Sequence, residues 1–430
     1  LATAKALVKS DAEVWAWDDT EAQRNTAKAE GLNLVNLYTC DWGAPGTLVL
    51  SPGIPDKYPE PHAIAAKARD HGCKIICDVD LLARSVNESF FVGITGTNGK
   101  STTTALLGKI FADAGRDVEI GGNYGVPALE LEPLGPEGIY VLELSSYQLE
   151  RIPSVALNVA ILLNISPDHV DRHGSMEGYV ATKKSIFERI KKDGFAIIGM
   201  DDSNCRGISL DLMVKSELSS PNIIPISAKR RFPGGVYVEG SILIDDIKNE
   251  RLPVLDLAEA LALPGQHNWQ NAAAALAVAR ITDVGLDEIS RSIRGFSGLP
   301  HRQELVRTIG LVHYINDSKA TNSEAAARAL VCYENVHWIV GGQLKQGSLD
   351  VLKHQLACIE HAYLIGEAAK RFTMALEGKV EITNSVNLEK AVEQAHQNAQ
   401  IDGRPAVVLL SPGCASFDQF PNYEARGDRF

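Results

Sequence analysis

The feature that most constrains the fold is a glycine-rich turn between a predicted strand and a predicted helix. The apolar run 90–95 is typical of a buried strand, and a helix is expected from Lys100 to about Ala114. Backbone N–H groups at a helix start are unpaired and carry partial positive charge, so they favour a phosphate group. Strand, turn and helix in this order therefore predict a phosphate-binding loop in an α/β domain with a mostly parallel sheet.

The sequence of this turn differs from the usual phosphate-loop pattern, in which four residues separate a first glycine from Gly-Lys-Ser/Thr. Position 94, where that glycine belongs, is isoleucine. The lysine would still neutralise phosphate oxygens, and the following serine would ligate Mg²⁺. A helix cap with a solvent-exposed lysine is the alternative. The candidate ATP-binding residues of the turn are Gly96, Thr97, Asn98, Gly99, Lys100, Ser101 and Thr102.

Strand-like runs alternate with helical patterns through most of the 430 residues, which favours parallel sheets with crossover helices. A chain of this length exceeds one hydrophobic core. We expect three α/β domains: a Rossmann-like domain over 1–86, a phosphate-loop domain over 87–297 and a second Rossmann-like domain over 298–430. Within the first, strands are predicted at 13–17, 47–51 and 74–77. Within the second, helices are predicted near 176–190 and at 270–281, and a hairpin over 234–244. The aperiodic stretch 295–304 is a predicted linker.

Charge and composition exclude several classes of protein. A net charge of −12 disfavours a nucleic-acid binder, because such proteins need a basic surface. No apolar run approaches the ~20 residues that cross a bilayer, so no membrane insertion is expected. The seven cysteines are scattered without metal-ligand spacing, which is typical of reduced thiols and predicts a cytoplasmic location. We expect a monomer.

Acidic and histidine side chains follow two further predicted strands. Glu143 comes directly after the apolar strand 139–143, and Asp168, His169 and Asp171 follow the strand predicted at 157–165. Carboxylates at strand ends beside a phosphate loop suit Mg²⁺. Taken singly, Glu143 could cap a helix and His169 could be an ordinary loop residue.

Several segments resemble the Mur ligase family. They are "GTNGKSTTT" (96–104), "ELSSYQLE" (143–150), "GLPHRQELV" (298–306), "YINDSKATNSEAA" (314–326) and "LLSPGCASFDQFPNYEARGDRF" (409–430). The later segments are similar to the branch that joins D-glutamate to UDP-N-acetylmuramoyl-L-alanine. The resemblance implies a cytoplasmic enzyme of peptidoglycan precursor synthesis, with ATP and two Mg²⁺ ions. ATP would phosphorylate the substrate carboxylate, and an amine would attack the acyl phosphate.

The resemblance also implies roles for individual residues. Lys100, Glu143, His169, Lys183 and Arg302 would be catalytic, with Arg302 near the γ-phosphate. Lys183, in "YVATKKSIF" (179–187), would be carbamylated and would help Ser101, Glu143 and His169 hold the metals; the alternative is an ordinary surface lysine. Asn268, Asn271 and Asp317 would contact the nucleotide, although the asparagines could simply be a polar helix start. The substrate-binding residues would be Ser51, Asn123, Ser145, Gln148, Lys319, Thr321, Lys345, Ser416 and Phe417.

Two departures and two alternatives accompany this interpretation. Gln343 stands where some family members carry an acidic residue. Either Asp18 or Asp19 could contact uridine. The glycine-rich first turn of a Rossmann-like domain is absent, so part of that domain is expected to precede Leu1. The alternatives are another amide ligase, such as a folylpolyglutamate synthase, and a phosphate-loop ATPase switch. Against the switch, Glu143 stands where such proteins carry the aspartate of their second nucleotide motif.

Overall fold

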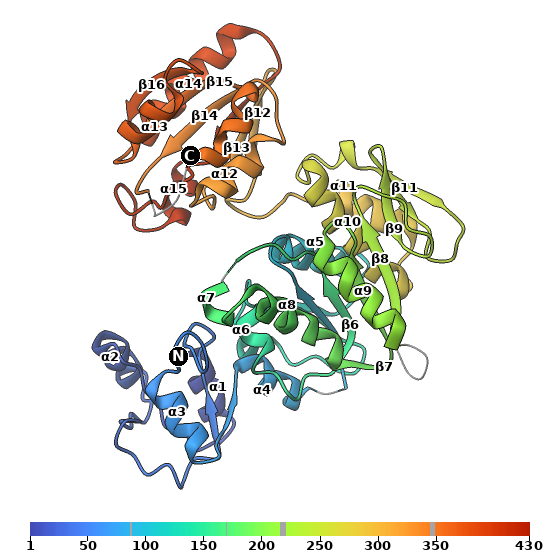
Figure 1. The fold of residues 1–430 in the computed structure, drawn as a ribbon, viewed down its shortest axis with the longest axis vertical. Coiled ribbons are helices and arrows are strands. Elements are labelled where there is room, and N and C mark those ends of the chain that lie inside the picture. The colour runs from blue at the N-terminus through green and yellow to red at the C-terminus, as the bar shows by residue number, and fades with distance from the viewer. Residues whose placement is uncertain (87, 169, 216–220, 345–348) are drawn as a thin grey trace. The chain divides into compact units, whose positions relative to one another are not determined.

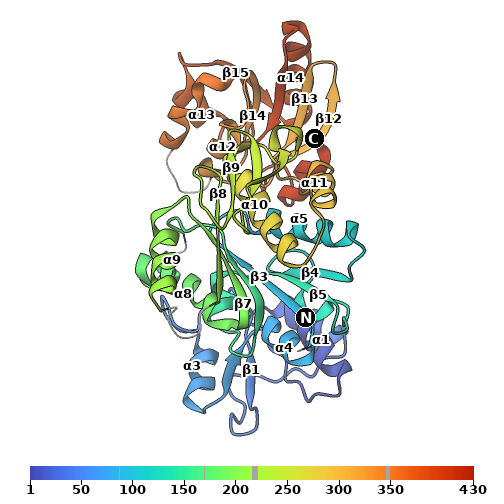
Figure 2. The same cartoon turned by 90° about the vertical axis from the view of Figure 1, so that its right-hand side faces the viewer.

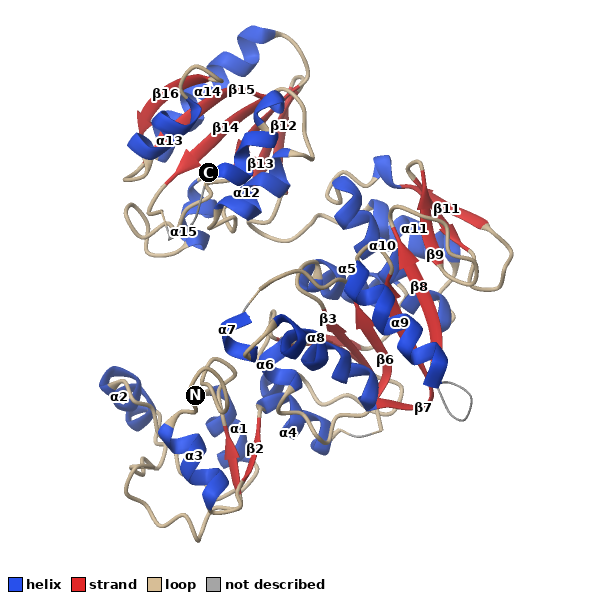
Figure 3. Ribbon diagram, in the orientation of Figure 1, coloured by secondary structure: helices blue, strands red, loops and turns tan. Residues whose placement is uncertain are grey.

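The protein has a mixed α/β fold (Figures 1 and 3). A computed structural model describes residues 1–86, 88–168, 170–215, 221–344 and 349–430. The chain forms two compact units, one of Leu1–Asp256 with Gln266–Ile293 and the other of Leu257–Gly265 with Arg294–Phe430. Among the described residues, every helix is too short or too polar to span a lipid bilayer. The division into three domains stays a prediction.

The beginning of the first unit carries a small parallel sheet. It is made of β1 (Thr47–Val49) and β2 (Lys74–Ile76). The strand predicted at 13–17 is wrong, because this segment pairs with its neighbour only through a single bridge between Ala16 and Leu34. A strand needs a continuous ladder of hydrogen bonds, and one bridge does not supply it. The helices here are α1 (Ala2–Lys9), α2 (Glu21–Ala29), α3 (Ala63–Asp70) and α4 (Asp78–Ser85).

A nine-stranded sheet dominates the first unit, in the order β11-β10-β9-β8-β7-β6-β3-β5-β4 (Figure 2). Each pair of neighbours from β4 to β9 in this order is parallel, and β10 is antiparallel to both of its neighbours, β9 and β11. The parallel strands are β3 (Phe90–Thr95), β4 (Val118–Gly122), β5 (Ile139–Glu143), β6 (Leu157–Leu162), β7 (Ile190–Gly199), β8 (Asn222–Ser227) and β9 (Val236–Glu239). The edge is β10 (Ile242–Asp245) and β11 (Leu252–Asp256). The expected strand 90–95 is confirmed.

Helices cover this sheet where the sequence supplies apolar or small residues. The long helix α10 (Gly265–Ile281) buries an alanine-rich face, and it begins five residues before the helix expected at 270–281. The helix expected near 176–190 ends earlier, at Lys184, and continues as a 3-10 turn over 185–189. The others are α5 (Lys100–Asp113), α6 (Ser146–Leu149), α7 (Val170–His173), α8 (Met176–Lys184), α9 (Ser203–Lys215) and α11 (Leu286–Arg294).

The second unit is built on a six-stranded sheet in the order β12-β13-β17-β14-β15-β16. All neighbours are parallel except β12 and β13. The strands are β12 (Glu304–Ile309), β13 (Val312–Asn316), β14 (Val336–Gly341), β15 (Ile359–Ile365), β16 (Glu381–Val386) and β17 (Ala406–Leu410). Its helices are α12 (Ser323–Leu330), α13 (Ala369–Leu376), α14 (Leu388–Asp402) and α15 (Tyr423–Arg429).

Replacing each of two glycines of the first unit by alanine should change stability in opposite directions. A Cβ on Gly199, at the end of β7, would lie 1.8 Å from the Leu163 carbonyl oxygen, whereas a Cβ on Gly207 of α9 would meet nothing within 4 Å. Gly199→Ala should therefore destabilise the unit by on the order of 2 kcal/mol or more. Gly207→Ala should stabilise it by up to about 1 kcal/mol, because alanine favours the helix. Thermal melting of both variants checks this; equal melting temperatures would contradict it.

Candidate active site

The phosphate loop leaves β3 in a backbone conformation that depends on two glycines. Gly96 has φ of 155° and Gly99 has φ of 85°, and α5 begins immediately afterwards at Lys100. A Cβ at Gly99 would lie 2.2 Å from Oδ1 of Asn271. Left-handed backbone and this close approach both exclude a side chain at position 99. The turn therefore presents the start of a fourteen-residue helix, as a phosphate site requires.

Asn164, which follows β6, holds the loop in this shape. Its Oδ1 accepts from the Asn98 backbone N–H at 2.9 Å, and its Nδ2 donates to the Asn98 carbonyl at 3.1 Å. Its own backbone carbonyl accepts from the Thr97 N–H at 2.9 Å. Three hydrogen bonds from one residue thus fix three consecutive peptide units, from Gly96 to Gly99. Sequence reasoning missed Asn164; its position at the end of a predicted strand was the available signal.

The polar residues at the start of α5 are placed for an anion. The Lys100 ammonium lies over the loop and donates to the carbonyls of Gly96 and Thr97, at 2.9 and 3.1 Å. Ser101 and Thr102 are buried in the first turn of the helix. A cation above exposed helix-end amides is the arrangement that neutralises a polyphosphate.

Glu143 ends β5 and pairs in register with Ile94 of β3. Its carboxylate is buried, and Oε1 accepts from Nδ2 of Asn123 at 2.7 Å. Within the part of the chain that the structure describes, Oε2 has no hydrogen-bond partner. A buried carboxylate oxygen without a partner is costly. It fits a divalent cation, which prefers such oxygens.

Lys183 points back to the same loop from α8. Its side chain is only 2% exposed, and the ammonium donates to the Gly96 carbonyl at 2.9 Å. Burial, assisted by the nearby Lys100 cation, lowers the pKa of Lys183 to about 7. The neighbouring Lys184 forms an ion pair with Asp211 at 2.6 Å. The structure thus favours Lys183 over Lys184 as the functional lysine of this segment.

The remaining predicted metal ligand, His169, lies outside the described residues. Among those described, no cluster of three or more histidine, cysteine, aspartate or glutamate side chains could hold a metal ion. Of the predicted metal ligands, Ser101, Glu143 and Lys183 are described, and all three lie at or beside the phosphate loop.

Two predicted substrate residues form the N-terminal cap of α6. The Ser145 hydroxyl accepts from the Gln148 backbone N–H at 3.2 Å and donates to Oε1 of Gln148 at 2.9 Å. Gln148 Oε1 also accepts from the Ser145 N–H at 3.0 Å. This reciprocal capping box fixes α6 directly after Glu143 and Leu144. Their structural role is thus plain, and substrate contact stays a prediction.

The two asparagines of α10 lie together beside the phosphate loop. Nδ2 of Asn271 donates to Oδ1 of Asn268 at 3.2 Å. Asn271 is buried against Gly99, and its Oδ1 has no hydrogen-bond partner within the described chain. The structure therefore brings these predicted nucleotide residues to the glycine turn. A solvated polar helix start would not be buried in this way.

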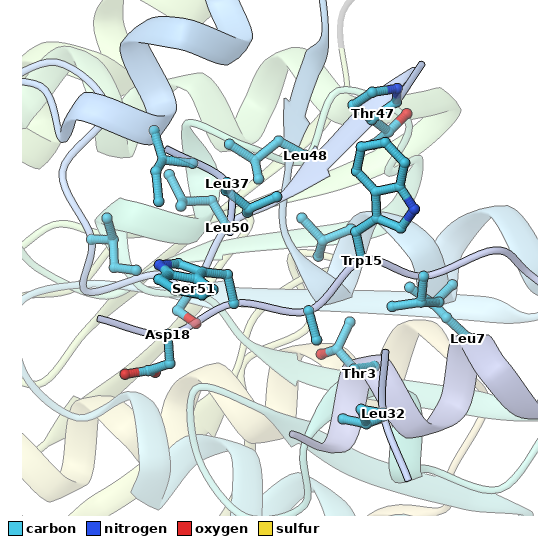
Figure 4. Close-up of a pocket in the computed structure, with 18 of the residues that line it drawn as sticks. Thr3, Leu7, Trp15, Asp18, Leu32, Leu37, Thr47, Leu48, Leu50 and Ser51 are labelled. Carbon is cyan, nitrogen blue, oxygen red and sulfur yellow. The ribbon is translucent and has the colours of Figure 1, made fainter. Parts of the chain in front are cut away.

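A cavity of about 1050 Å³ lies in the small-sheet part of the first unit (Figure 4). Residues from α1, from 12–19 and from 44–55 line it, among them Trp15, Asp18, Leu48 and Ser51. Asp19 is already engaged, since its carboxylate contacts His62 at 2.8 Å and accepts from the Tyr38 hydroxyl at 3.0 Å. Within the described residues, the carboxylate of Asp18 accepts one hydrogen bond, from the Thr20 N–H at 2.8 Å. Asp18 is therefore the better candidate for a ligand.

In the second unit, predicted residues gather after the carboxyl ends of β13 and β17. These strands are neighbours in the sheet. Asp317, Lys319 and Thr321 follow β13, and Ser416 and Phe417 lie beyond β17. Ser416 is buried and Phe417 is 66% exposed. Gln343 pairs with Ala415 through two backbone hydrogen bonds of 2.9 Å. Lys345 lies outside the described residues.

Asp317 is a buried acid of this unit. The Ser411 hydroxyl donates to its carboxylate at 2.7 Å, and the Gln303 N–H donates at 3.3 Å. Burial raises the pKa of Asp317 to about 7 despite these bonds. His301 and Arg302 precede β12; Nδ1 of His301 lies 3.0 Å from Nδ2 of Asn316, and Lys319 N–H donates to the His301 carbonyl.

Comparison with known proteins decides the family. The Mur ligase middle domain matches residues 94–279. The UDP-N-acetylmuramoylalanine–D-glutamate ligases of Caulobacter vibrioides and Rhodospirillum rubrum are each 47% identical over 436 residues, covering 100% of this chain and 92% and 91% of theirs. The chain belongs to the Mur ligase family. The resemblance seen in the sequence is confirmed, and the relatives place this Mur ligase in the branch of that name.

Solved structures agree on the fold of this Mur ligase. The D-alanyl-D-alanine-adding ligase of Acinetobacter baumannii has a TM-score of 0.58 at 19% identity and covers 86% of this chain and 87% of its own. The MurF ligase of Thermotoga maritima, solved in complex with ADP, has a TM-score of 0.57 at 18% identity and covers 91% and 97%. The predicted α/β class with large, mostly parallel sheets is confirmed.

The raised pKa of Asp317 predicts a pH-dependent penalty in this Mur ligase. Between about pH 4 and pH 7 the unfolded chain has lost the Asp317 proton while the folded chain keeps it, so stability falls as pH rises through this window. One pKa unit corresponds to about 1.4 kcal/mol. Asp317→Asn should match the wild type near pH 4 and become more stable by a few kcal/mol above pH 7.

Thermal melting at pH 5 and pH 8 measures this difference. The control is Asp350→Asn, which removes an exposed carboxylate of the same unit, 71% exposed at its side chain. Its difference from the wild type should stay the same at both pH values. An Asp317→Asn variant that is no more stable than the wild type at pH 8 would contradict the penalty.

Proposed function

We propose that this chain is an ATP-dependent ligase that adds D-glutamate to UDP-N-acetylmuramoyl-L-alanine in the cytoplasm, as a step of peptidoglycan precursor synthesis. The relatives that share its whole length carry the name of this reaction. The observation that carries the proposal furthest is the Glu143 carboxylate oxygen that has no hydrogen-bond partner among the described residues, on the strand beside the phosphate loop. Together they suit a metal–nucleotide complex.

The phosphate loop would hold the triphosphate of ATP. Lys100 and the N–H groups at the start of α5 would balance charge on the transferring phosphoryl group. Asn268 and Asn271, beside Gly99, would contact the nucleotide. A related Mur ligase was solved in complex with ADP, which agrees with a nucleotide in this fold.

Glu143 and Ser101, with His169 and a carbamylated Lys183, would hold two Mg²⁺ ions. Bound Mg²⁺ would supply charge neutralisation at the phosphoryl oxygens. Carbamylation needs a neutral amine, and the lowered pKa of Lys183 leaves much of that amine neutral near pH 7. The carbamate would replace the buried cation by an anion, which suits a site that otherwise offers few carboxylates.

The reaction would then proceed in two steps. The alanyl carboxylate oxygen attacks the γ-phosphorus, the bond to the β-phosphate oxygen breaks, and ADP leaves. The D-glutamate amine next attacks the alanyl carbonyl, the phosphate leaves as inorganic phosphate, and the amine loses a proton. Lys319, Thr321, Ser416 and Phe417, with Lys345, would bind the two glutamate carboxylates, and Arg302 and Asp317 would face the nucleotide.

The cavity of the first unit would receive the uridine diphosphate portion. The loop 51–55, which lines it, is similar to the loop around that portion in the family. Asp18 would contact uridine. We expect the enzyme to act as a monomer.

A ligation assay with purified protein tests the function. With ATP, Mg²⁺ and UDP-N-acetylmuramoyl-L-alanine, phosphate release should require D-glutamate and should be weak with L-glutamate, L-lysine or meso-diaminopimelate. Turnover with another amino acid would assign another amide ligase of the superfamily. Phosphate release that is independent of both substrates would favour an ATPase switch.

Lys183→Ala should abolish ligation, with partial recovery when formate or acetate is added, because a small carboxylate can take the place of the lost carbamate. Lys184→Ala is the matched control and should retain activity, since Lys184 pairs with Asp211 at the surface. Initial rates of phosphate release, with and without the acids, measure the effect. Full activity of the Lys183→Ala variant would rule out the role.

A further inference from the structure

The loop 51–56 of the small-sheet part of the first unit is held from outside that part. One side of the loop, from Ser51 to Pro55, lines the 1050 Å³ cavity. The residue that holds it is Arg151, which follows α6 and therefore belongs to the large-sheet part. The loop thus stands between the cavity and the segment that carries Glu143, Ser145 and Gln148.

The Arg151 guanidinium makes three contacts with the loop. Arg151 is fully buried; Nη1 donates to the Ser51 carbonyl at 3.0 Å, and Nη2 donates to the Ile54 carbonyl at 2.5 Å and to the Asp56 carboxylate at 2.8 Å. The Arg151 carbonyl also accepts from the Cys77 N–H at 3.1 Å. A planar fork that binds three groups of one loop fixes its orientation as well as its distance.

Asp56 also contacts a second arginine of the large-sheet part, Arg172. Nη2 of Arg172, in α7, lies 3.3 Å from the Asp56 carboxylate and 3.4 Å from that of Glu150. Burial alone would raise the pKa of Asp56, but Arg151 and then Arg172 hold it below its usual value. Asp56 is 5% exposed, so this carboxylate is buried as an ion beside Arg151 and Arg172. Arg69 of α3 lies 3.8 Å from it on the small-sheet side. Asp56 therefore links the loop to both α6 and α7.

The contacts continue to the capped start of α6. Nδ1 of His173, the last residue of α7, lies 3.2 Å from the Glu150 carboxylate, and its Nε2 lies 2.9 Å from the Ser146 hydroxyl. Ser146 adjoins the Ser145–Gln148 cap. Loop 51–56, the end of α6 and α7 are consequently one continuous polar network within the first unit.

We propose that Asp56 and Arg151 are positioning residues, which hold the substrate loop 51–56 at a fixed place relative to Glu143 and the phosphate loop. This inference rests on the proposed function, in which one substrate has its uridine end in the cavity and its reacting carboxylate at the phosphate loop. Such a substrate bridges the two sheets, so the distance between its two sites must match its length.

The physical argument is one of preorganisation. A displacement of about 1 Å at a reacting group can lower a rate ~100-fold. If the loop were free to move, the substrate that binds to it would have to order it. This would weaken the binding of the uridine-linked substrate and of no other substrate. In the proposed function, ATP and D-glutamate bind without contacting the loop. The positioning role therefore predicts a selective effect on one of three substrates.

The test is steady-state kinetics of Arg151→Lys and Asp56→Asn in the full chain. Lysine keeps the charge but cannot bind three groups of a loop with a planar fork. We expect KM for UDP-N-acetylmuramoyl-L-alanine to rise at least tenfold in Arg151→Lys and less in Asp56→Asn. KM for ATP and for D-glutamate should stay within twofold, at a temperature where each variant is folded.

Asp245→Asn is the matched control. Asp245 is a buried carboxylate of the first unit that pairs with Arg280 at 2.6 Å, at the antiparallel edge of the large sheet. Its loss should lower the melting temperature without changing any KM. If Arg151→Lys and Asp56→Asn behave like this control, the network is structural only and the proposal is overturned.

Hydrogen exchange of the ligand-free protein separates this inference from the proposed function. Amides of 51–57 should exchange at least tenfold faster in Arg151→Lys than in the wild type, while those of 90–95 should not change. A wild type without ligase activity would refute the function, whereas unchanged exchange in an active variant would refute the positioning. If Arg151→Lys does not fold, Asp56→Asn gives the same two readouts.

Discussion

The hydrogen bonds between Asn164 and the phosphate loop are the interaction on which the rest of the site depends. They join the end of β6 to the turn that follows β3, and these strands are neighbours in the sheet. The next strand, β5, delivers Glu143 to the same edge. Because parallel strands end together, three separate segments of sequence reach the glycine turn without any long loop. The turn has its shape before a nucleotide binds.

This preorganisation leaves polar groups without partners. Within the described chain, Oε2 of Glu143 and Oδ1 of Asn271 are buried and make no hydrogen bond. Each such group reduces stability by on the order of 1–3 kcal/mol. Large buried clusters of apolar residues beneath the sheet offset that loss. These two groups lie beside the phosphate loop, where a bound ligand would complete them.

The sequence predicted the central part of the fold well, because strand, glycine turn and helix each carry a local pattern. The strand 90–95 and the hairpin of β9 and β10 follow from such patterns. The prediction of a strand at 13–17 was wrong, because an apolar pattern does not indicate whether a partner strand is present. Asn164, Arg151 and Asp56 were missed for a related reason: single polar residues far apart in sequence acquire meaning only through tertiary contacts.

Burial shifts the pKa values of Lys183 and Asp317 in opposite directions, to about 7 in both cases. The common cause is that a buried charge loses its hydration, so each side chain is driven toward its neutral form. A ligand of opposite charge reverses that preference, because it supplies the interaction that water no longer provides. Both residues are thus closest to neutral when no ligand is bound. Because each pKa lies near 7, a small change in surroundings changes the protonation of either side chain at neutral pH.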